Sequence, residues 1–307
     1  MAEICLFTLF IFLFLAGMAV LRIGLFNLSG DKLKVFLEKM TDRPWKGFLT
    51  GTLFTGILQS SSAVMVMTVG LVSSGSMTFA QSIGIILGTN IGSALTVEFM
   101  TFTLERWILP MIIIGAVLSF SYKTWIKSLG ISLIGISAVF AAIGGFKMLA
   151  SSVTALPAVQ VLLQHIEGHA LIALLTGILL TALIHSSSAT IGISMSLLLS
   201  GDLTLPSAIL IMLGSNVGTC ITGYMAGIGS GMEAKFTAYA HIWLNILGVL
   251  AFLPFIDAFS EFAVWLTADK MAQLAHASLI FNLGTSLAVL PFARSFAKLI
   301  LLIHHRK

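Results

Sequence analysis

The stretch Gly56-Ile57-Leu58-Gln59-Ser60-Ser61-Ser62-Ala63 decides how this chain folds, and Ala182-Leu183-Ile184-His185-Ser186-Ser187-Ser188-Ala189 repeats it 126 residues later. Each stretch places three consecutive hydroxyl side chains in the middle of an apolar segment. We name residues 59–62 the first tip and residues 185–188 the second tip. Polar groups and irregular backbone at membrane depth are tolerated only where protein buries them or where they line a polar cavity. The two tips are therefore predicted to be the two halves of one buried polar site.

The composition is that of an integral membrane protein. Of 307 residues, 58% are hydrophobic and only 9% are charged, whereas soluble domains carry about 25% charged residues. Several apolar runs reach the roughly 20 residues that a helix needs to cross a bilayer. The alternating pattern of membrane strands is absent, so the spans are expected to be helices. The net charge of +4 comes from basic residues in short loops, which argues against nucleic acid as a partner.

An internal duplication covers both tips. Residues 49–96 align with residues 175–222 at an offset of 126 without a gap, and 20 of the 48 positions are identical. The identical positions include polar residues and glycines such as Thr55/Thr181, Asn90/Asn216 and Gly92/Gly218. Shared apolar composition does not explain matches of this kind, so the chain contains two copies of one unit.

Loop charges predict that each tip turns back inside the membrane. The 12 residues 47–58 measure only about 18 Å as a helix, which reaches the middle of a bilayer. If both tips turn back, the basic loop residues gather on one side, whereas crossing segments would place Lys123 and Lys127 on the opposite side. Because basic residues concentrate on the cytoplasmic side, we expect two re-entrant hairpins. The protein would lie in the cell membrane with its N-terminus outside and its C-terminus in the cytoplasm.

The hairpins also predict that the two copies are inverted. Three apolar segments, residues 78–100, 108–122 and 129–150, separate the tips, and three crossings reverse the second copy. Inverted repeats around a site at the membrane midplane are typical of secondary transporters. The expected fold is an all-α integral membrane protein with two inverted-topology repeats, each containing a re-entrant helical hairpin and transmembrane helices. Its expected parts are a first repeat (1–125), a second, inverted repeat (126–256), and a final transmembrane helix with a basic cytoplasmic tail (257–307). The connector at residues 31–46 is expected to form a short surface helix or a loop.

The tips carry the side chains expected to bind substrate. New half-helices should start near Ser62 and Ser188, and their free N–H groups and positive dipole ends would face the tips. Together with hydroxyl, amide and imidazole groups, this arrangement suits an anion. The predicted substrate-binding residues are Gln59, Ser60, Ser61, Ser62, His185, Ser186, Ser187 and Ser188.

A second pair of motifs, residues 88–92 and 214–218, suggests cation binding. In each motif, two glycines flank a hydroxyl residue and an asparagine, about ten residues or ~15 Å from the expected helix starts at Thr78 and Thr204. Glycine permits a helix to unwind, and freed carbonyl groups with asparagine oxygens are ligands suited to sodium. The predicted sodium-binding residues are Gln59, Thr89, Asn90, Ser215 and Asn216. No cofactor and no metal other than co-transported sodium is expected, because Cys5 and Cys220 lack metal-site spacing.

Basic residues are expected to stay away from the middle of the spans. Arg22, Arg106 and Lys147 are placed near span ends, and Glu98 is expected at a membrane interface. An anion at the midplane would then have to be balanced by helix dipoles and co-bound cations. If the substrate is an anion, the sequence therefore favours transport coupled to a cation.

At these motifs the chain resembles the type II sodium–phosphate cotransporter family. The paired tips, each followed by a Gly-x-Asn-x-Gly element, look like the duplicated signature of that family, and the similarity extends to the late segments 240–245 and 275–282. The resemblance implies sodium-driven symport of inorganic phosphate, with the tips contributing to phosphate and sodium binding. Some bacterial relatives append a regulatory helical domain, and this chain, which stops at Lys307, is expected to be a bacterial member with the membrane core only.

His185 is where this sequence departs from that family, which usually repeats glutamine at the second tip. Imidazole can donate or accept a hydrogen bond and can change its charge near neutral pH. Alternatives that stay open are another oxyanion as substrate, phosphate export, and proton coupling through His185. An intramembrane serine hydrolase is a further alternative, although the first tip has Gln59 where the base would stand. His241 and His276 are expected to make structural hydrogen bonds, and Asn245 and Asn282 to join helices.

Overall fold

The computed structural model describes residues 2–29 and 43–304, and these residues form α-helices joined by loops and short 3-10 helices. Within these ranges, six helical segments are long and apolar enough to cross a membrane. They are Ala2–Leu28, Phe79–Phe99, Thr124–Thr154, Leu205–Gly227, Met232–Leu266 and Lys270–His304. The expected all-α membrane protein is confirmed. The expected connector at residues 31–46 lies outside the described residues except for its last four positions, and so does the end of the basic tail.

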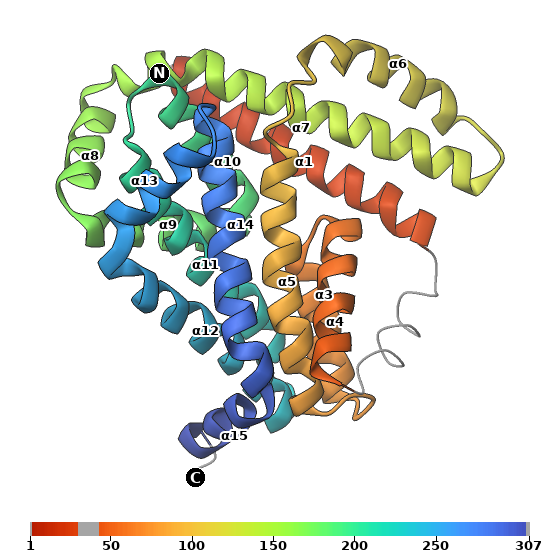
Figure 1. The fold of residues 1–307 in the computed structure, drawn as a ribbon. Helices are drawn as coiled ribbons and strands as arrows, with labels where there is room; N and C mark the ends of the chain where they lie inside the picture. The colour runs from red at the N-terminus through yellow and green to blue at the C-terminus, as the bar shows by residue number, and fades with distance from the viewer. Residues whose placement is uncertain (1, 30–42, 305–307) are drawn as a thin grey trace.

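The elements follow one another in three groups (Figure 1). The first group contains α1 (Ala2–Ser29), α3 (Pro44–Leu58), α4 (Ser61–Ser73), α5 (Phe79–Phe99), η1 (Glu105–Trp107) and α6 (Ile108–Ser119). The second contains α7 (Thr124–Thr154), α8 (Pro157–Gly168), α9 (Ala170–Ile184), α10 (Ser187–Ser200) and α11 (Leu205–Gly227). The third contains α12 (Met232–Phe252), η2 (Leu253–Phe255), α13 (Ile256–Leu266), α14 (Lys270–Val289), η3 (Leu290–Phe292) and α15 (Ala293–His304).

The two copies run in opposite directions. Thr78, which precedes α5, lines a surface cavity with Arg294 and Lys298 of α15. Tyr239, near the start of α12, stacks on His304 of α15 with ring centroids 4.3 Å apart. Because α12 follows α11 after a short loop, α5 begins and α11 ends at the end of the molecule where α15 lies (Figure 1). Equivalent helices of the two copies are thus antiparallel, as inverted repeats require.

Helix α6 differs from its prediction as one of three crossings between the tips. It has 12 residues, about 18 Å, which is too short to cross a bilayer alone. It ends at Ser119, whose hydroxyl donates to the Ala116 carbonyl over 2.7 Å, and the chain turns there into α7. The inversion of the copies therefore depends on helix directions and not on three crossings.

Glycines set the packing of α3 on α5 and of α9 on α11. A Cβ added at Gly88 would collide with the Phe48 carbonyl oxygen of α3, and one added at Gly214 would collide with the Leu174 carbonyl oxygen of α9. Helices α5 and α11 are continuous through these positions, so the predicted unwinding is wrong. The physical reason is that a helix can keep its backbone hydrogen bonds and use missing side chains for close packing.

The last third of the chain holds another internal correspondence. Asn245 and residues 253–255, Leu-Pro-Phe, recur 37 positions later as Asn282 and residues 290–292. Each leads from a long helix through a 3-10 turn into a short helix, giving α12-η2-α13 and α14-η3-α15. Residues 257–304 therefore contain α14 and α15 and nearly all of α13, where the sequence analysis expected one final helix and a tail.

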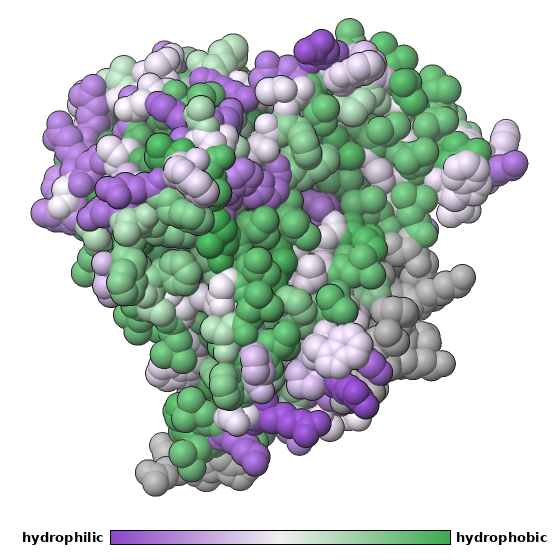
Figure 2. Space-filling model, viewed as in Figure 1, coloured by the Kyte–Doolittle hydropathy of each residue, from purple (hydrophilic) through white to green (hydrophobic). Residues whose placement is uncertain are grey.

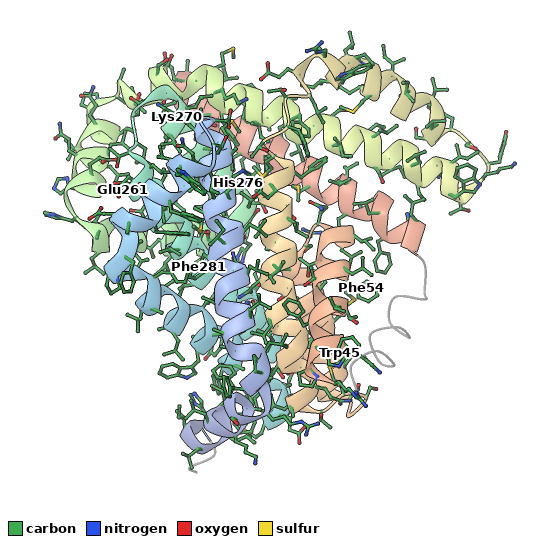
Figure 3. All side chains as sticks on the ribbon, viewed as in Figure 1. Trp45, Phe54, Glu261, Lys270, His276 and Phe281 are labelled. Carbon is green, nitrogen blue, oxygen red and sulfur yellow. The ribbon has the colours of Figure 1, made fainter. Side chains whose placement is uncertain are left out.

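The short helices of this correspondence carry opposite charges. Asp257 and Glu261 of α13 stand where α15 has Arg294 and Lys298. Figures 1 and 3 show α13, with Glu261, at the upper left, and α15 at the bottom of the same view. The two ends of the molecule thus differ in charge.

Apolar side chains cover much of the outer surface. Figure 2 shows apolar residues over the middle of the visible face, with polar residues gathered at the upper left and at the bottom. Among the exposed residues are Leu109, Val117 and Leu183. Exposed apolar surface of this extent marks contact with lipid and not with water.

Candidate functional site

Both tips are sharp turns between two helices. Gln59 ends α3 with φ 51° and His185 ends α9 with φ 56°, a left-handed conformation that is uncommon for residues other than glycine. Ser60 and Ser186 follow in extended conformation, and their hydroxyls accept hydrogen bonds from the N–H groups of residues 63 and 189 over 3.1 and 3.2 Å. Each serine is therefore the N-cap of the next helix. The sequence predicted both turns, with helix starts one residue later than observed.

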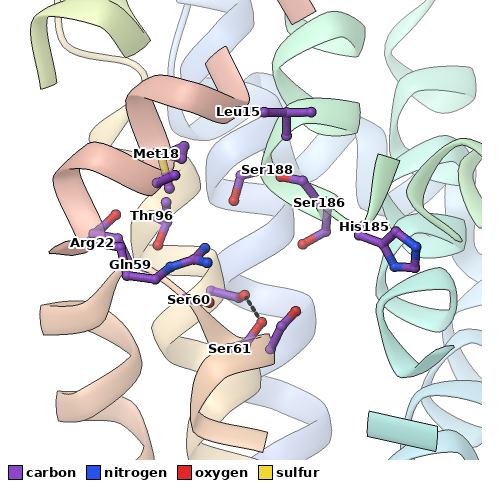
Figure 4. A pocket seen from close by; sticks show the side chains of 14 residues that line it. Leu15, Met18, Arg22, Gln59, Ser60, Ser61, Thr96, His185, Ser186 and Ser188 are labelled. Atoms are coloured by element: carbon purple, nitrogen blue, oxygen red, sulfur yellow. Dashed lines mark hydrogen bonds between the residues drawn. The ribbon is translucent and has the colours of Figure 1, made fainter. Parts of the chain in front are cut away.

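The two tips meet in one cavity of about 140 Å³, which we name the tip cavity. This volume is several times the ~10–15 Å³ that one water needs, so the cavity can hold a small oxyanion. All eight predicted substrate residues line it. The lining residues are Leu15, Met18, Ala19, Arg22, Gln59, Ser60, Ser61, Ser62, Ser93, Thr96, His185, Ser186, Ser187 and Ser188. Figure 4 shows the two tips facing each other across this space.

Hydroxyl groups on neighbouring helices hold the first tip. The Ser93 hydroxyl of α5 donates to Ser61 Oγ over 2.9 Å. The Thr222 hydroxyl of α11 donates to Ser62 Oγ over 3.3 Å. Because α5 and α11 belong to different copies, the first tip is bonded to both of them. A movement of one copy relative to the other would therefore change the bonds at this tip.

Gln59 and His185 occupy equivalent turns but point in different directions. Gln59 is half-buried and extends toward the tip cavity, and its Nε2 donates to the Gly56 carbonyl over 2.5 Å. His185 is exposed, and its ring points away from the space between the tips (Figure 4). The two side chains thus differ in what they can contact.

Two buried oxygens at the end of α3 accept no hydrogen bond from any described residue. They are Thr55 Oγ1 and Gln59 Oε1, one helical turn apart on the same face. In the second copy, the equivalent Thr181 donates to Thr190 over 2.9 Å. The first copy has Val64 where the second has Thr190, so Thr55 lacks that partner. Such oxygens are the ligand type that sodium prefers.

The other four predicted sodium residues lie outside the lining of the tip cavity. Thr89 and Ser215 are fully buried, and their hydroxyls donate to backbone carbonyls one turn earlier. Asn90 donates to Asn245 Oδ1 over 3.2 Å, and its own oxygen lies 3.3 Å from His241 Nε2. Asn216 donates to the Met212 carbonyl over 3.0 Å. Sodium binding by these four residues stays a prediction, because none of them lines the tip cavity.

Three polar lining residues were missed by the sequence reasoning. Ser93 and Thr96 follow Asn90 at helical spacing on α5, and the duplication already pairs Thr96 with Thr222. Arg22 was placed near the end of a span, away from the site. The structure corrects this, because α1 passes beside the first tip and brings Arg22 into the lining. A single arginine within a long apolar run was the available signal.

A larger cleft adjoins the tip cavity. It has a volume of about 700 Å³ and is lined by Arg22, Ile23, Phe26, Asn27, Leu58, Ser62, Ala63, Val66, Met67 and Thr222. Arg22 and Ser62 line both spaces. The cleft and the tip cavity are therefore neighbours on either side of these two residues.

An imidazole–carboxylate pair joins α14 to α5 away from this lining. His276 Nδ1 lies 2.8 Å from Glu98 Oε1. His276 thus has a hydrogen-bond partner on another helix, and its structural role stays a prediction. It also gives Glu98 a partner that the sequence had not identified.

The comparison with known protein families matches each copy of the duplication separately. The profile described as Na+/Pi-cotransporter matches residues 13–148 and again residues 143–283, so one profile fits each half of the chain. This chain belongs to the Na+/Pi-cotransporter family. A relative from Bacillus subtilis (strain 168), the uncharacterized protein YqeW, is 44% identical over 297 residues, covering 97% of both chains.

Two further relatives have functional names. The putative inorganic phosphate export protein YjbB of Escherichia coli (strain K12) is 24% identical over 92% of this chain and 52% of its own length. The human sodium-dependent phosphate transport protein 2B is 36% identical over 29% of this chain and 14% of its own length. The chain thus spans about half of the former protein and a small part of the latter. No solved structure matches it.

Proposed function

We propose that this family member is a secondary active transporter that carries inorganic phosphate together with sodium across the cell membrane by alternating access. The observation that carries the proposal is the meeting of two tips, one from each inverted copy, in a single polar cavity. A site shared by two antiparallel copies can be opened to either side by movement of one copy against the other. The relatives named for phosphate transport support the choice of substrate.

Phosphate binding is assigned to the hydroxyls and helix N-termini of the tips. Ser61, Ser187 and Ser188 can turn their hydroxyl hydrogens toward phosphate oxygens. Helices α4 and α10 start at the tips, and their positive dipole ends favour an anion there. Ser60 and Ser186 keep the turns in place as N-caps.

Sodium is assigned to the end of α3. Thr55 and Gln59 offer buried oxygens beside the tip, and an oxygen buried without a partner costs about 1–3 kcal/mol. A bound sodium ion would offset that cost and would also neutralise part of the phosphate charge. This is a physical reason for coupling the two ions.

Phosphate export is the second candidate, because the relative that covers 92% of this chain carries that name. The intramembrane hydrolase gains no support. None of the described residues in the lining of the tip cavity is acidic, and the His185 ring points away from the serines. A nucleophile would therefore lack its oriented base there.

Flux of radiolabelled phosphate in proteoliposomes tests the proposal. We expect uptake that follows an inward sodium gradient and falls to background when choline replaces sodium. Flux that ignores sodium but follows a proton gradient would reject sodium coupling. Vesicles loaded with phosphate and given sodium on either side determine whether the protein also exports phosphate.

Serine variants test the site itself. A hydrogen bond to a charged group contributes about 1.5–3 kcal/mol, so Ser61→Ala and Ser187→Ala should raise the KM for phosphate roughly 10- to 100-fold. The matched control is Ser73→Ala, an exposed serine on the same helix as Ser61, which should transport normally. Normal KM values for phosphate in both tip variants would show that phosphate does not bind to these serines.

A further inference from the structure

Arg22 is a positively charged residue in the lining of the tip cavity, and neither the predicted phosphate ligands nor the predicted sodium ligands include it. It lies on α1 and lines the cavity together with both tips, and Figure 4 shows it beside Gln59. Its Nε is buried and donates to no described residue. The guanidinium makes no ion pair with any residue that the structure describes. The positive charge of Arg22 is therefore not neutralised by any described residue.

The surroundings make such a charge costly. Helix α1 contains an 18-residue stretch with a mean hydropathy of 2.8, the highest among the six candidate spans, and Arg22 lies in the last third of this helix. A charged side chain within a span costs free energy, which rises to roughly 2.5–3.5 kcal/mol at the centre of the span on insertion scales. Charged residues persist in such segments where they face a polar cavity or meet an opposite charge. Arg22 faces the cavity, and the described lining residues include no carboxylate that would neutralise it.

Arg22 also stands where the wide cleft meets the tip cavity, because it lines both. Arginine offers Nε–H and Nη–H groups in a fixed planar fork, which matches two oxygens of a phosphate.

We propose that Arg22 is the charge-selecting anchor of the tip cavity: its guanidinium binds two oxygens of the oxyanion and makes the site prefer divalent over monovalent phosphate. The inference rests on the proposed function. It assigns anion selectivity to α1, while the tips supply hydroxyl groups that would bind either form. One positive side chain favours the more highly charged anion by Coulomb attraction in the low dielectric of the membrane interior.

The experiment compares wild type, Arg22→Lys and Arg22→Gln in proteoliposomes, with Arg106→Gln as the matched control. Arg106 is exposed on η1 and does not line the cavity. Phosphate KM is measured across the pH range in which phosphate changes from monovalent to divalent. We expect Arg22→Gln to raise KM roughly 10- to 100-fold at alkaline pH and to lose the preference for divalent phosphate. Arg22→Lys should keep the preference with weaker binding, and Arg106→Gln should match wild type.

Thermal stabilisation by phosphate and by sulfate in detergent provides a readout that does not need transport. Arg22→Gln should lose stabilisation by both anions while its melting point without ligand stays close to that of wild type. An Arg22→Gln protein with wild-type KM, pH profile and phosphate stabilisation would overturn the inference and leave the proposed function intact. A wild-type protein that neither binds nor moves phosphate would overturn both. If Arg22→Gln does not fold, loss of the preference in Arg22→Lys would also overturn the inference, because lysine keeps the charge.

Discussion

Thr55 and Gln59 show at the residue scale how the duplicated copies have diverged. Both copies keep the threonine, but only the second pairs it, through Thr190. Val64 in the first copy leaves Thr55 Oγ1 without a hydrogen-bond partner among the described residues. The turn residues have diverged in the same way, because Gln59 extends toward the cavity and His185 points outward. These differences are why the proposed sodium site is assigned to the first copy.

Replacing Val64 by threonine should weaken sodium binding. In Val64→Thr the Thr55 hydroxyl would donate to the new hydroxyl, as Thr181 donates to Thr190, and this bond would hold the Thr55 side chain toward residue 64 instead of leaving it to turn toward sodium. We expect the sodium concentration for half-maximal phosphate flux to rise about tenfold, which corresponds to ~1.4 kcal/mol. Val66→Thr is the matched control, because Val66 lies on the same helix and is exposed. An unchanged sodium dependence of phosphate flux in Val64→Thr would show that Thr55 is not a sodium ligand.

At the scale of elements, close helix contacts hold each hairpin against its neighbour. Gly88 and Gly214 occupy equivalent positions in α5 and α11, and each lies against a backbone carbonyl of the helix before its tip. The same contact in both copies positions both tips. Since neither helix unwinds here, these glycines serve the site by placing α3 and α9.

Alanine at these glycines should destabilise the protein. Overpacking a close contact costs about 1–3 kcal/mol, so Gly88→Ala and Gly214→Ala should lower the thermal midpoint in detergent. Gly70→Ala is the control, because a Cβ added at Gly70 of α4 meets no atom within 4 Å. That change should be neutral or slightly stabilising, since alanine favours a helix by up to about 1 kcal/mol over glycine. Equal midpoints in all three variants would show that the contacts do not limit stability.

At the scale of the whole molecule, charge distinguishes the two ends. The short helices α13 and α15 occupy equivalent places in the third group, yet one is acidic and the other basic at matching positions. Basic residues favour the cytoplasmic side. From these two helices we expect α15 inside and α13 outside, which is the orientation that the sequence analysis also predicted.

Labelling of introduced thiols tests that orientation. In a Cys5→Ser background, which leaves only the buried Cys220, Glu261→Cys and Lys298→Cys would be exposed to a membrane-impermeant maleimide. We expect labelling at position 261 in intact cells and at position 298 only after permeabilisation. The reverse pattern would invert the proposed topology, and labelling of both positions in intact cells would show that they do not lie on opposite sides.

The sequence by itself determined the membrane fold, the duplication and the two turning points, because each of them produces a pattern that can be recognised in the sequence. Apolar run length sets helix spans, a constant offset reveals the copies, and a serine run interrupts a helix within a residue of the expected place. The eight predicted substrate residues line one cavity. The sequence identified all eight because the duplication shows that the two tips are equivalent.

Only the tertiary structure decided which other groups reach that cavity. The position of Arg22 depends on how α1 passes the first tip, and the different directions of Gln59 and His185 depend on neighbouring helices. The glycines of α5 and α11 permit either unwinding or close packing, and the facing backbone of α3 and α9 selects packing. Each of these outcomes depends on contacts between segments far apart in the chain, which local patterns do not encode.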